Sequence, residues 1–441
     1  MNIKNALLLS LLLPIATIAQ ETKIVTLDQA IELGLKNSKQ LVMTDGKRNA
    51  AKAKYDQQRF TTIPVLSLNS SYLYNSPNVD EAKFATGPGS YQLISMTLHN
   101  QNQNRASLSQ IIFAGLRGYN IINSTKNLMR AADLDAEKDK NDIKNNITIA
   151  YYNHLKLKES KKIVDENMKV LQQRKADMDN LQKVGMALQN DVLKVELAIL
   201  NLQQNIADVQ SAIDISNYNL CVALGLPETT SIECAEAGLF QSKAAADKQA
   251  FFQQSLTNRN DLKAANYRLE ASKSLVKASK SGYSPTISAG ANLYYSNPNQ
   301  RVFLVPENNK GKYYYSWDIG VSLTWNLTNL FTTTYQTREA KANQKQTEAM
   351  TQQLADGVKM EVNSNYSSYK LALDKIDIAK KTVEKSREDQ RITKNQYDNG
   401  LKNISDMLDI DNSYTTSQIN LTNAKIDAEV AYVRLMKAAG N

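Results

Sequence analysis

The chain has 441 residues, a formal net charge of +9 and a mean hydropathy of −0.45. Its lysines and arginines are interspersed with acidic residues and form no basic block, so we attribute the charge to solvated helix faces and expect no nucleic-acid partner. The sequence has only two histidines and no Ser/His/Asp set, phosphate loop or metal-ligand spacing. We therefore expect no enzyme, no catalytic residues, no metal and no cofactor.

Residues 1–20 have the pattern of a secretory signal peptide. Lys4 supplies the positive start, residues 6–18 are apolar, and residues 16–20 form a cleavage zone with small side chains. The apolar run is too short for a membrane-spanning helix, and no later run reaches the roughly 18 residues that such a helix needs. We therefore expect an exported protein.

The remainder of the chain is similar to itself. A shift of 215 positions places Gly185 on Gly400, whereas in the earlier part of each copy a shift of 221 positions places Pro64 on Pro285. The difference places a six-residue length change in a loop rich in Gly, Pro and Asn that precedes Gln110. Such changes are typical of surface loops.

We therefore predict a single protomer over residues 21–441, with repeat one over 26–225, repeat two over 247–440 and a linker over 226–246. Two copies are too few for a solenoid, so a duplicated fold with internal pseudo-symmetry fits better. Each repeat is predicted to run helix, strand, loop, strand, long helix, tight turn, helix. The first helix opens with Thr26 and a Gln three residues later, which is a capping-box pattern.

Strands are expected within residues 63–113 and 284–328. Residues 317–327 show the clearest alternation, with apolar side chains at every second position and polar ones between them. Four strands of about ten residues have the length of tilted transmembrane strands. The face of an ordinary soluble β-sandwich is the alternative. Aromatic residues gather at the strand ends, as in the girdle of a membrane barrel: Tyr72, Tyr74, Tyr294, Tyr295, Tyr313, Tyr314, Tyr315 and Trp317.

Two very long helices follow the strands. Residues 119–184 contain no Gly or Pro, and only Gly357 interrupts residues 331–399. At 1.5 Å per residue, such a stretch gives roughly 100 Å of helix. Gly185 and Gly400 then mark tight turns, after which the chain returns as a second helix. We predict two antiparallel helical hairpins whose narrow apolar stripes pack laterally.

Four strands facing lipid require more than one chain. The smallest transmembrane barrels use eight strands, and an open sheet edge in lipid leaves backbone groups unpaired. Two copies would give eight strands and a filled interior, whereas three would give twelve and room for a channel. The polar side of residues 317–327 favours a wet lumen, so we predict a trimer.

Cys221 and Cys234 lie 13 positions apart, at the end of a helical stretch and in the linker. In an exported protein a disulfide between them is plausible. Two unpaired thiols are the alternative, and the sequence leaves both open.

This organisation resembles the outer-membrane efflux protein family, the TolC-like channels, over essentially the whole mature chain. The likeness rests on "LDQAIELGLKNSKQL" at 27–41, on "NRNDL" at 258–262, and on two tip segments at 184–196 and 399–411. In each tip segment a Gly is followed six residues later by an Asp. Asn260 stands where the family usually has Pro, which is a mild departure.

The resemblance implies a fold of helices and transmembrane β-strands, in which a homotrimer forms a 12-stranded β-barrel continued by a 12-helix tunnel. It implies a place in the outer membrane of a Gram-negative-type cell, with the tunnel in the periplasm. The implied partners are outer-membrane lipid, a periplasmic adaptor (membrane fusion) protein and an inner-membrane transporter. The implied function is passive efflux of small molecules such as drugs, metabolites or lipids. The exit duct of a type I protein secretion system and a coiled-coil structural spacer are the alternatives.

The resemblance also implies a periplasmic gate. Asp406 and Asp409 match the carboxylates that ring the constriction, Tyr397 and Lys402 match the residues that flank the turn, and Asp191 matches their acidic partner on the other hairpin. The two carboxylates are three positions apart on one helix face, so three copies would bring six of them around one axis. Ordinary helix-start acids are the alternative. Lys402 stands where the best-known member of the family has an Arg, and a Lys cannot form a bidentate bond. We therefore expect a looser polar contact, or latch, between the two hairpin turns.

The two turns have a second implied role. Val184, Gly185, Met186, Gly400 and Leu401 match the tip residues that contact the adaptor in the family. The plain alternative for the two glycines is a helix-hairpin turn.

Overall fold

The computed structural model describes residues 22–76, 82–94, 100–235, 247–297 and 312–441. The predicted signal peptide, residues 1–20, lies outside the described residues. The chain divides into two compact units. The helical unit comprises Met1–Thr44, Ala136–Asn260 and Ala355–Asn441, and the strand unit comprises Asp45–Asp135 and Asp261–Leu354.

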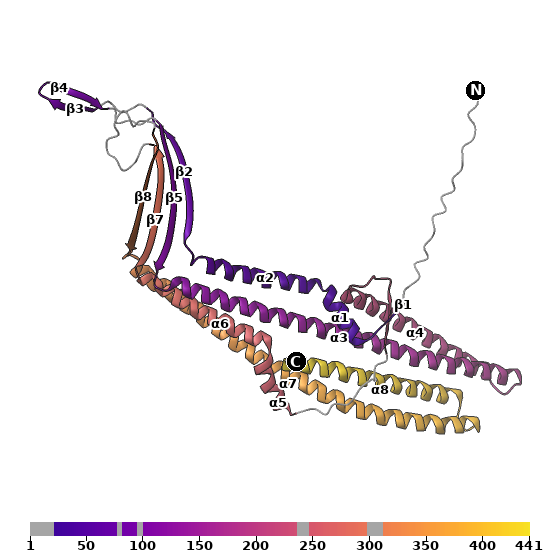
Figure 1. Ribbon diagram of the computed structural model, residues 1–441. Helices are drawn as coiled ribbons and strands as arrows, with labels where there is room; N and C mark the ends of the chain where they lie inside the picture. Colours follow the sequence, from indigo (N-terminus) through magenta and orange to yellow (C-terminus); the bar gives the residue numbers. More distant parts are fainter. Residues whose placement is uncertain (1–21, 77–81, 95–99, 236–246, 298–311) are drawn as a thin grey trace, which may run out of the picture. The chain divides into compact units, whose positions relative to one another are not determined.

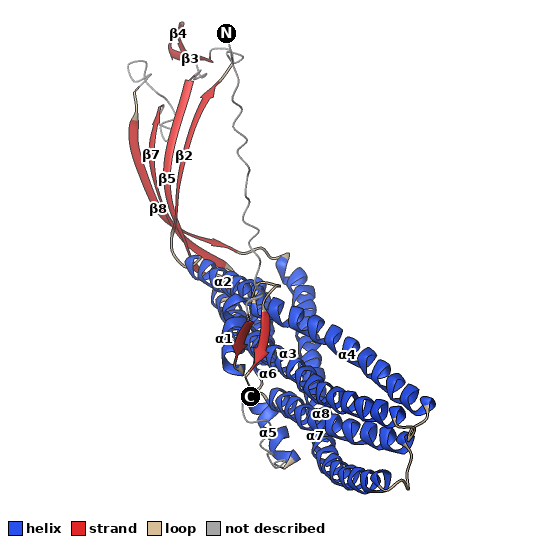
Figure 2. Ribbon diagram, turned by 90° about the vertical axis from the view of Figure 1, so that its right-hand side faces the viewer, coloured by secondary structure: helices blue, strands red, loops and turns tan. Residues whose placement is uncertain are grey.

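The strand unit contains a four-stranded antiparallel sheet in the order β2-β5-β7-β8. Its strands are β2 (Val65–Tyr74), β5 (Asn100–Phe113), β7 (Thr286–Asn297) and β8 (Tyr314–Thr324) (Figures 1 and 2). Because β2 and β8 stand at the two ends of this order, each has one edge that no described strand covers. The sheet thus pairs two strands from each half of the sequence.

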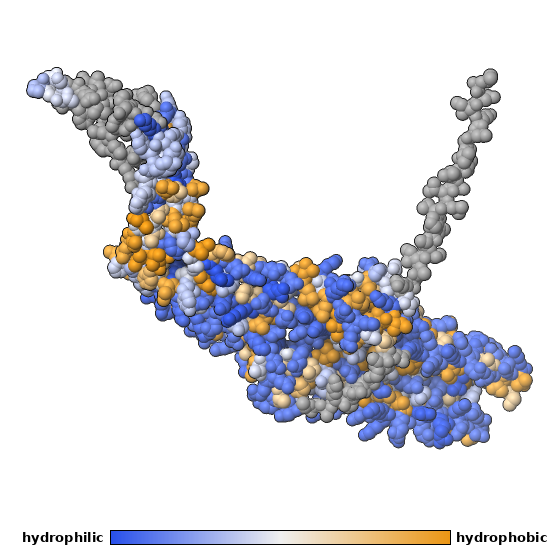
Figure 3. All heavy atoms as spheres, viewed as in Figure 1, coloured by the Kyte–Doolittle hydropathy of each residue, from blue (hydrophilic) through white to orange (hydrophobic). Residues whose placement is uncertain are grey.

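One side of this sheet is apolar and exposed. The register places Leu68, Ala106, Leu293 and Trp317 in one row across the four strands. Leu68 is 80% exposed, Trp317 70% and Val321 75%. Figure 3 shows hydrophobic residues gathered on the part of the sheet that adjoins the helices of the same unit. These side chains do not pack into a core within the chain.

The other side of the sheet carries a polar network. Asn292 donates from Nδ2 to Asp318 Oδ1 at 2.6 Å and accepts from Arg105 Nη2 at 2.7 Å. Farther along, the hydroxyls of Ser288 and Ser322 lie 2.8 Å apart. The period-two pattern of residues 317–327 therefore separates an apolar side from a polar one.

A second hairpin, β3 (Ala82–Gly87) with β4 (Ser90–Ile94), lies where the sequence predicts only a loop. Gly89 has φ +83 in its turn, a backbone conformation that glycine adopts without steric cost. The sequence of this short hairpin shows no strong alternation of apolar and polar residues. Its Gly and Pro residues therefore indicate a loop.

The long helices have the predicted lengths. They are α3 (Arg117–Lys183) and α4 (Gln189–Leu224) in the first half, and α7 (Asn329–Asp398) and α8 (Ile404–Ala439) in the second. Helix α7 continues through Gly357 without a break. A single glycine costs about 1 kcal/mol of helix stability, which a helix of 70 residues tolerates.

The first helix of each half is broken in two, although one helix was predicted. The pieces are α1 (Leu27–Asn37) and α2 (Lys39–Phe60) in the first half, and α5 (Lys248–Asn258) and α6 (Asn260–Ser279) in the second, where a short 3-10 helix η1 (Lys280–Tyr283) follows. Ser38 and Arg259 separate the pieces with extended backbones, at ψ 112 and 122. Both breaks are held by tertiary contacts. Asn37 donates to Leu224 O at 2.8 Å, and Arg259 pairs with Glu361 at 2.6 Å.

The predicted linker contains a strand. Residues Ser231–Cys234 form β6, which pairs in parallel with the first described strand, β1 (Thr22–Val25). Ile232 and Val25 are buried in a cluster with Ile147 and Leu220. This core fixes the N-terminal strand and the linker against helices α3 and α4.

No disulfide joins Cys221 and Cys234, so the first of the two alternatives is incorrect. Cys221 Sγ donates to Thr230 O at 3.3 Å, whereas Cys234 Sγ lies 3.9 Å from Tyr151 O. The Cys221 thiol contacts the residue that precedes β6, whereas Cys234 is the last residue of β6 and its thiol faces a carbonyl of α3. Burial raises the pKa of the Cys234 thiol to about 12, which keeps it protonated.

Among the helices in the described part of the chain, none combines the length and the apolar character needed to cross a membrane.

Candidate functional site at the hairpin turns

The two hairpin turns are built alike. Gly185 and Gly400 have φ 76 and φ 73, a left-handed conformation that residues with a Cβ rarely adopt. In each turn the glycine N–H bonds a carbonyl three residues back, and the next N–H bonds one five residues back, as in a Schellman motif. A Cβ at either glycine would meet nothing within 4 Å, so the backbone angle alone requires glycine.

Apolar side chains project from both turns into solvent. Val184, Met186 and Leu401 are each at least 68% exposed, and Leu188 is 72% exposed. Solvent-exposed apolar residues scattered singly are common, but these four gather at the two hairpin turns. The predicted tip residues are therefore placed at the turns.

Asp406 has a structural role in the single chain. It is the third residue of α8, where its carboxylate accepts from Asn403 N at 3.1 Å while Asn403 Oδ1 accepts from Asp406 N at 3.0 Å. This reciprocal capping box satisfies two N–H groups at the start of the helix. Lys402 Nζ lies 3.8 Å from Asp406 Oδ1.

Asp409 lies one turn farther along α8 and is exposed. It borders a surface groove of about 370 Å³ together with Lys194, Asn201 and Asn205 of α4. Asp191 of the first hairpin, which a shift of 215 places on Asp406, pairs with Lys194 at 3.3 Å. The structure therefore records no ion pair between Lys402 and Asp191 among the described residues. The latch across hairpins stays a prediction.

Tyr397 links the two hairpins. Its hydroxyl donates to Met178 Sδ at 3.2 Å, and its ring packs against a buried cluster that includes Met178, Val195 and Met407. Burial raises the pKa of the Tyr397 hydroxyl; Arg174 opposes this shift, and Asp191 adds to it. The tyrosine therefore stays neutral and holds α7 to α3.

A buried ion pair lies behind the turns and was missed by the sequence reasoning. Arg174 Nε donates to Asp411 Oδ2 at 2.5 Å, and Gln390 donates to the other carboxylate oxygen at 2.8 Å. The Asp411 side chain is 2% exposed and that of Arg174 16%. Three helices, α3, α7 and α8, thus meet at one carboxylate. The repeat offers a signal, because a shift of 215 places the acid Glu196 on Asp411.

Among the described residues, no group of three or more His, Cys, Asp and Glu side chains has the geometry of a metal site.

Comparisons with known proteins identify the family. The sequence profile of the family described as Outer membrane efflux protein matches residues 30–226 and 251–441. No curated protein matches the sequence.

Several solved structures share the fold. The outer membrane protein VceC of Vibrio cholerae superimposes with a TM-score of 0.78 at 18% identity, covering 94% of this chain and 96% of that one. The CmeC outer membrane channel of Campylobacter jejuni has a TM-score of 0.76 at 16% identity, with 94% and 85% covered. The MtrE outer membrane channel of Neisseria gonorrhoeae has a TM-score of 0.73 at 14% identity, with 94% and 89% covered. On the family match to both halves of its sequence, the chain belongs to the outer membrane efflux protein family.

Proposed function

We propose that the protein is an outer-membrane channel that passively conducts small molecules, handed over by an inner-membrane pump and a periplasmic adaptor, to the cell exterior. The observation that carries the proposal is the exposed apolar side of the four-stranded sheet in a member of this family. Removing such a surface from water is favourable at about 25 cal/mol per Å². Hydrocarbon is the environment that removes it while leaving the polar side wet.

Three copies close the wall. In one chain β2 and β8 each leave an edge without a strand partner among the described residues, and unpaired backbone groups in lipid cost several kcal/mol each. Pairing β8 of one copy with β2 of the next covers both edges. Three copies give a barrel of 12 strands, whose polar side, with Arg105, Asn292 and Asp318, then lines a lumen. The hairpins of the three copies would supply the 12 helices of a periplasmic tunnel.

The hairpin turns would form the gate. Asp406 and Asp409 of three copies would place six carboxylates near the axis, a ring that attracts cations and can bind divalent blockers. Tyr397, Lys402 and Asp191 would hold the turns together. Lys402 already lies near Asp406, so the proposed latch has to compete with that contact.

The exposed tip residues would contact the adaptor. Val184, Met186 and Leu401 would supply the apolar contact, while Gly185 and Gly400 fix the turns. Interfaces gain most from such clustered apolar groups when they become fully desolvated.

Conductance in a planar lipid bilayer tests the proposal. The purified protein is expected to give discrete, cation-preferring channels that divalent cations block. Replacing Asp406 and Asp409 together by Ala should raise conductance or weaken the block. Asp427→Ala, on the same helix but in an exposed pair with Lys156, serves as the matched control and should leave both unchanged.

Two outcomes count against the proposal. Absence of any conductance, with the protein extracted from cells without detergent, would favour a structural spacer. An unaltered channel in the Asp406/Asp409 double variant would remove the gate assignment and leave the channel itself in place.

A further inference from the structure

Two charged side chains lie close together on the polar side of the four-stranded sheet. In the described strands β2, β5, β7 and β8, Arg105 and Asp318 are the only charged residues. The register places Arg105 in the row of Tyr294, and Asp318 in the row of Asn292, which is the next row on the same side. Such rows follow one another at about 7 Å. The proposed gate and the adaptor-binding turns belong to the other unit, so neither role accounts for these charges.

One amide lies between the two charges. Asn292 Oδ1 accepts from Arg105 Nε at 3.1 Å and from Arg105 Nη2 at 2.7 Å, while Asn292 Nδ2 donates to Asp318 Oδ1 at 2.6 Å. Within the described strands, the structure records no direct ion pair between Arg105 and Asp318. A neutral amide satisfies donors of the guanidinium without neutralising its charge. The positive charge of Arg105 therefore acts on its surroundings.

Arg105 is the more exposed of the two charged residues. It is exposed on the polar side of the sheet, whereas Asn292 and Asp318 are half-buried. Its Cζ lies 5.5 Å from the centroid of the Tyr294 ring. An aromatic face attracts a guanidinium and helps to hold it in place, and it leaves the charge unaltered. A solute that passes the polar side of the sheet therefore meets the positive charge at closer range than the negative one.

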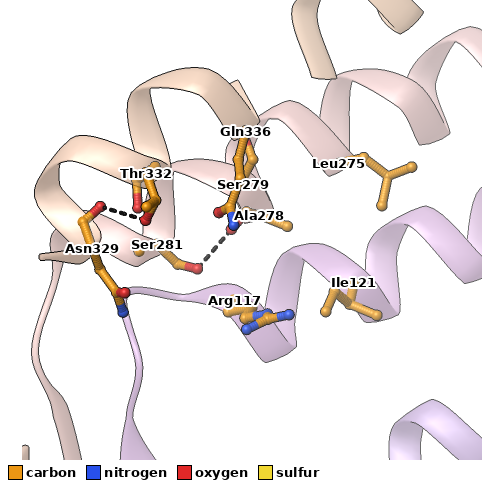
Figure 4. Close-up of a pocket in the computed structure, with 11 residues that line it drawn as sticks. Arg117, Ile121, Leu275, Ala278, Ser279, Ser281, Asn329, Thr332 and Gln336 are labelled. Carbon is orange, nitrogen blue, oxygen red and sulfur yellow. Dashed lines mark hydrogen bonds between the residues drawn. The ribbon is translucent and has the colours of Figure 1, made fainter. Parts of the chain in front are cut away.

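A second donor lies beside the bridging amide. Ser107 follows Arg105 by two residues on β5 and is the register partner of Asn292, so all three side chains are on the same side. The hydroxyl oxygen of Ser107 is buried and has no hydrogen-bond partner, which is unusual. By contrast, at a polar cavity of the same unit the hydroxyl of Ser281 donates to Ala278 O at 2.6 Å (Figure 4). The Ser107 hydroxyl is therefore available to the Asn292 amide.

From these observations we propose that Arg105 determines the specificity of the barrel, by favouring the passage of anions and of small molecules that carry a carboxylate. The guanidinium turns from the Asn292 amide to the passing anionic group, and the hydroxyl of Ser107 then donates to Asn292 Oδ1 in its place. This exchange is favourable because a guanidinium bonds an anion more strongly than a neutral amide. The Ser107 donor keeps the amide satisfied meanwhile.

The place of Arg105 in a lumen rests on the proposed function. Three copies would put three guanidinium groups at one level of the barrel, and rings of Arg or Lys are typical of pores for anions. The acidic ring of the proposed gate has the opposite sign and a different setting. Its carboxylates move apart when the turns open, whereas Arg105 lies on a hydrogen-bonded sheet that keeps its width. In the open channel the barrel therefore opposes the cation preference of the turns.

The test is to measure reversal potentials of the full protein in a planar bilayer, first across a KCl gradient and then with potassium benzoate on one side as the carboxylate probe. Arg105→Gln removes the positive charge, Arg105→Lys keeps it, and Asp318→Asn removes the negative one. Arg48→Gln, which changes the charge equally on helix α2 outside the sheet, is the matched control. Arg48 forms a half-exposed pair with Asp45 at 3.3 Å.

The expected result is a change in ion preference that follows the charge. One unit charge at about 8 Å in water changes the local concentration of an ion about twofold, and less at high salt. The ratio of cation to anion permeability should therefore rise about twofold in Arg105→Gln and fall by less in Asp318→Asn. It should stay unchanged in Arg105→Lys and Arg48→Gln. Benzoate permeability should fall about twofold in Arg105→Gln alone.

Three results would overturn the proposal: an unaltered ratio in Arg105→Gln, an equal change in Arg105→Lys, or a ratio that rises in Asp318→Asn. The last two would mean that side-chain shape, and not charge, sets the preference. The wild-type protein separates this proposal from the proposed function. Normal wild-type channels with any of these three results reject only the assignment of Arg105, whereas a wild-type protein that forms no channel rejects the proposed function.

Discussion

Helix α8 makes polar contacts that its counterpart α4 lacks, although the turns that precede the two helices have the same backbone. Helix α8 begins with a side-chain cap from Asn403, whereas Leu188 at the start of α4 makes no such bond. Asp411 of α8 is buried with Arg174, whereas its counterpart Glu196 forms a half-exposed pair with Lys175 at 3.2 Å. Backbone geometry has thus been kept between the halves, while the side-chain contacts have diverged.

This difference implies that side chains at matching positions of α8 and α4 contribute unequally to stability. A buried charge that loses its partner is costly, whereas an exposed ion pair contributes little because water replaces it. Equivalent substitutions in the two halves should therefore have different effects, and the pairs below test this directly.

The largest difference is expected between Asp411→Asn and Glu196→Gln. The first leaves the buried Arg174 guanidinium without its carboxylate and should cost about 3–5 kcal/mol. The second breaks an exposed pair and should cost less than about 1 kcal/mol. Thermal denaturation in detergent, followed by circular dichroism, measures both. Equal melting temperatures for the two variants would show that the halves do not differ in this way.

A smaller effect is expected at the packed first helix of each half. A Cβ on Gly34 would overlap Ile147 Cδ1, whereas the equivalent position in the second half, at a shift of 221, accommodates the buried side chain of Ser255. Gly34→Ala should therefore destabilise the protein by about 1–3 kcal/mol through overpacking.

The control for this substitution is Gly46→Ala. Gly46 lies inside helix α2, and a Cβ there would meet nothing within 4 Å. Alanine should stabilise that helix by up to about 1 kcal/mol. A gain in melting temperature for Gly34→Ala would contradict the close packing of α1 on α3.

The caps can be exchanged between the hairpins. Asn403→Ala removes a capping box and should cost about 1 kcal/mol. Leu188→Asn places the same residue before α4, where Asp191 already occupies the third position, and should stabilise by a similar amount. Hydrogen exchange of the first amides of each helix reports the two effects separately. Unchanged protection in both variants would show that the turns, and not the caps, fix the helix starts.

Local signals explain which elements the sequence could predict. The long helices follow from stretches without Gly or Pro, the turns from Gly185 and Gly400, and the exposed sheet face from strict alternation in residues 317–327. Each of these signals lies within one element. They required no knowledge of what the element contacts.

Elements that depend on distant contacts were missed. The break at Ser38 is held by Asn37 bonding Leu224, and β1 pairs with β6 across more than 200 positions. A four-residue strand has too few residues to show a period. Likewise, nothing local distinguishes Asp411, which is buried, from Asp409, which is exposed, because burial depends on which face meets α3.

The smallest predicted effect concerns acid sensitivity in one half only. His154 is fully buried, with Nδ1 2.7 Å from Ser216 Oγ and Nε2 3.1 Å from Ile232 O. Its counterpart at a shift of 215 is Tyr369, which is also buried. Burial lowers the pKa of His154; the carbonyl of Ile232 and the carboxylate of Glu233 oppose that shift, and Lys158 adds to it.

The sign of the pH dependence follows from this lowered pKa. The unfolded chain binds a proton near pH 6.5, whereas the folded chain does so only at lower pH, so the stability due to His154 is complete above about 6.5 and declines as the pH falls below it. The slope is at most about 1.4 kcal/mol per pH unit. The melting temperature of the wild type should therefore fall more between about pH 7.5 and about pH 5.5 than that of His154→Gln, which cannot titrate there. If the melting temperatures of the two proteins fell in parallel with pH, protonation of the His154 imidazole would cost no stability. This buried position would then be equally insensitive to acid in both halves.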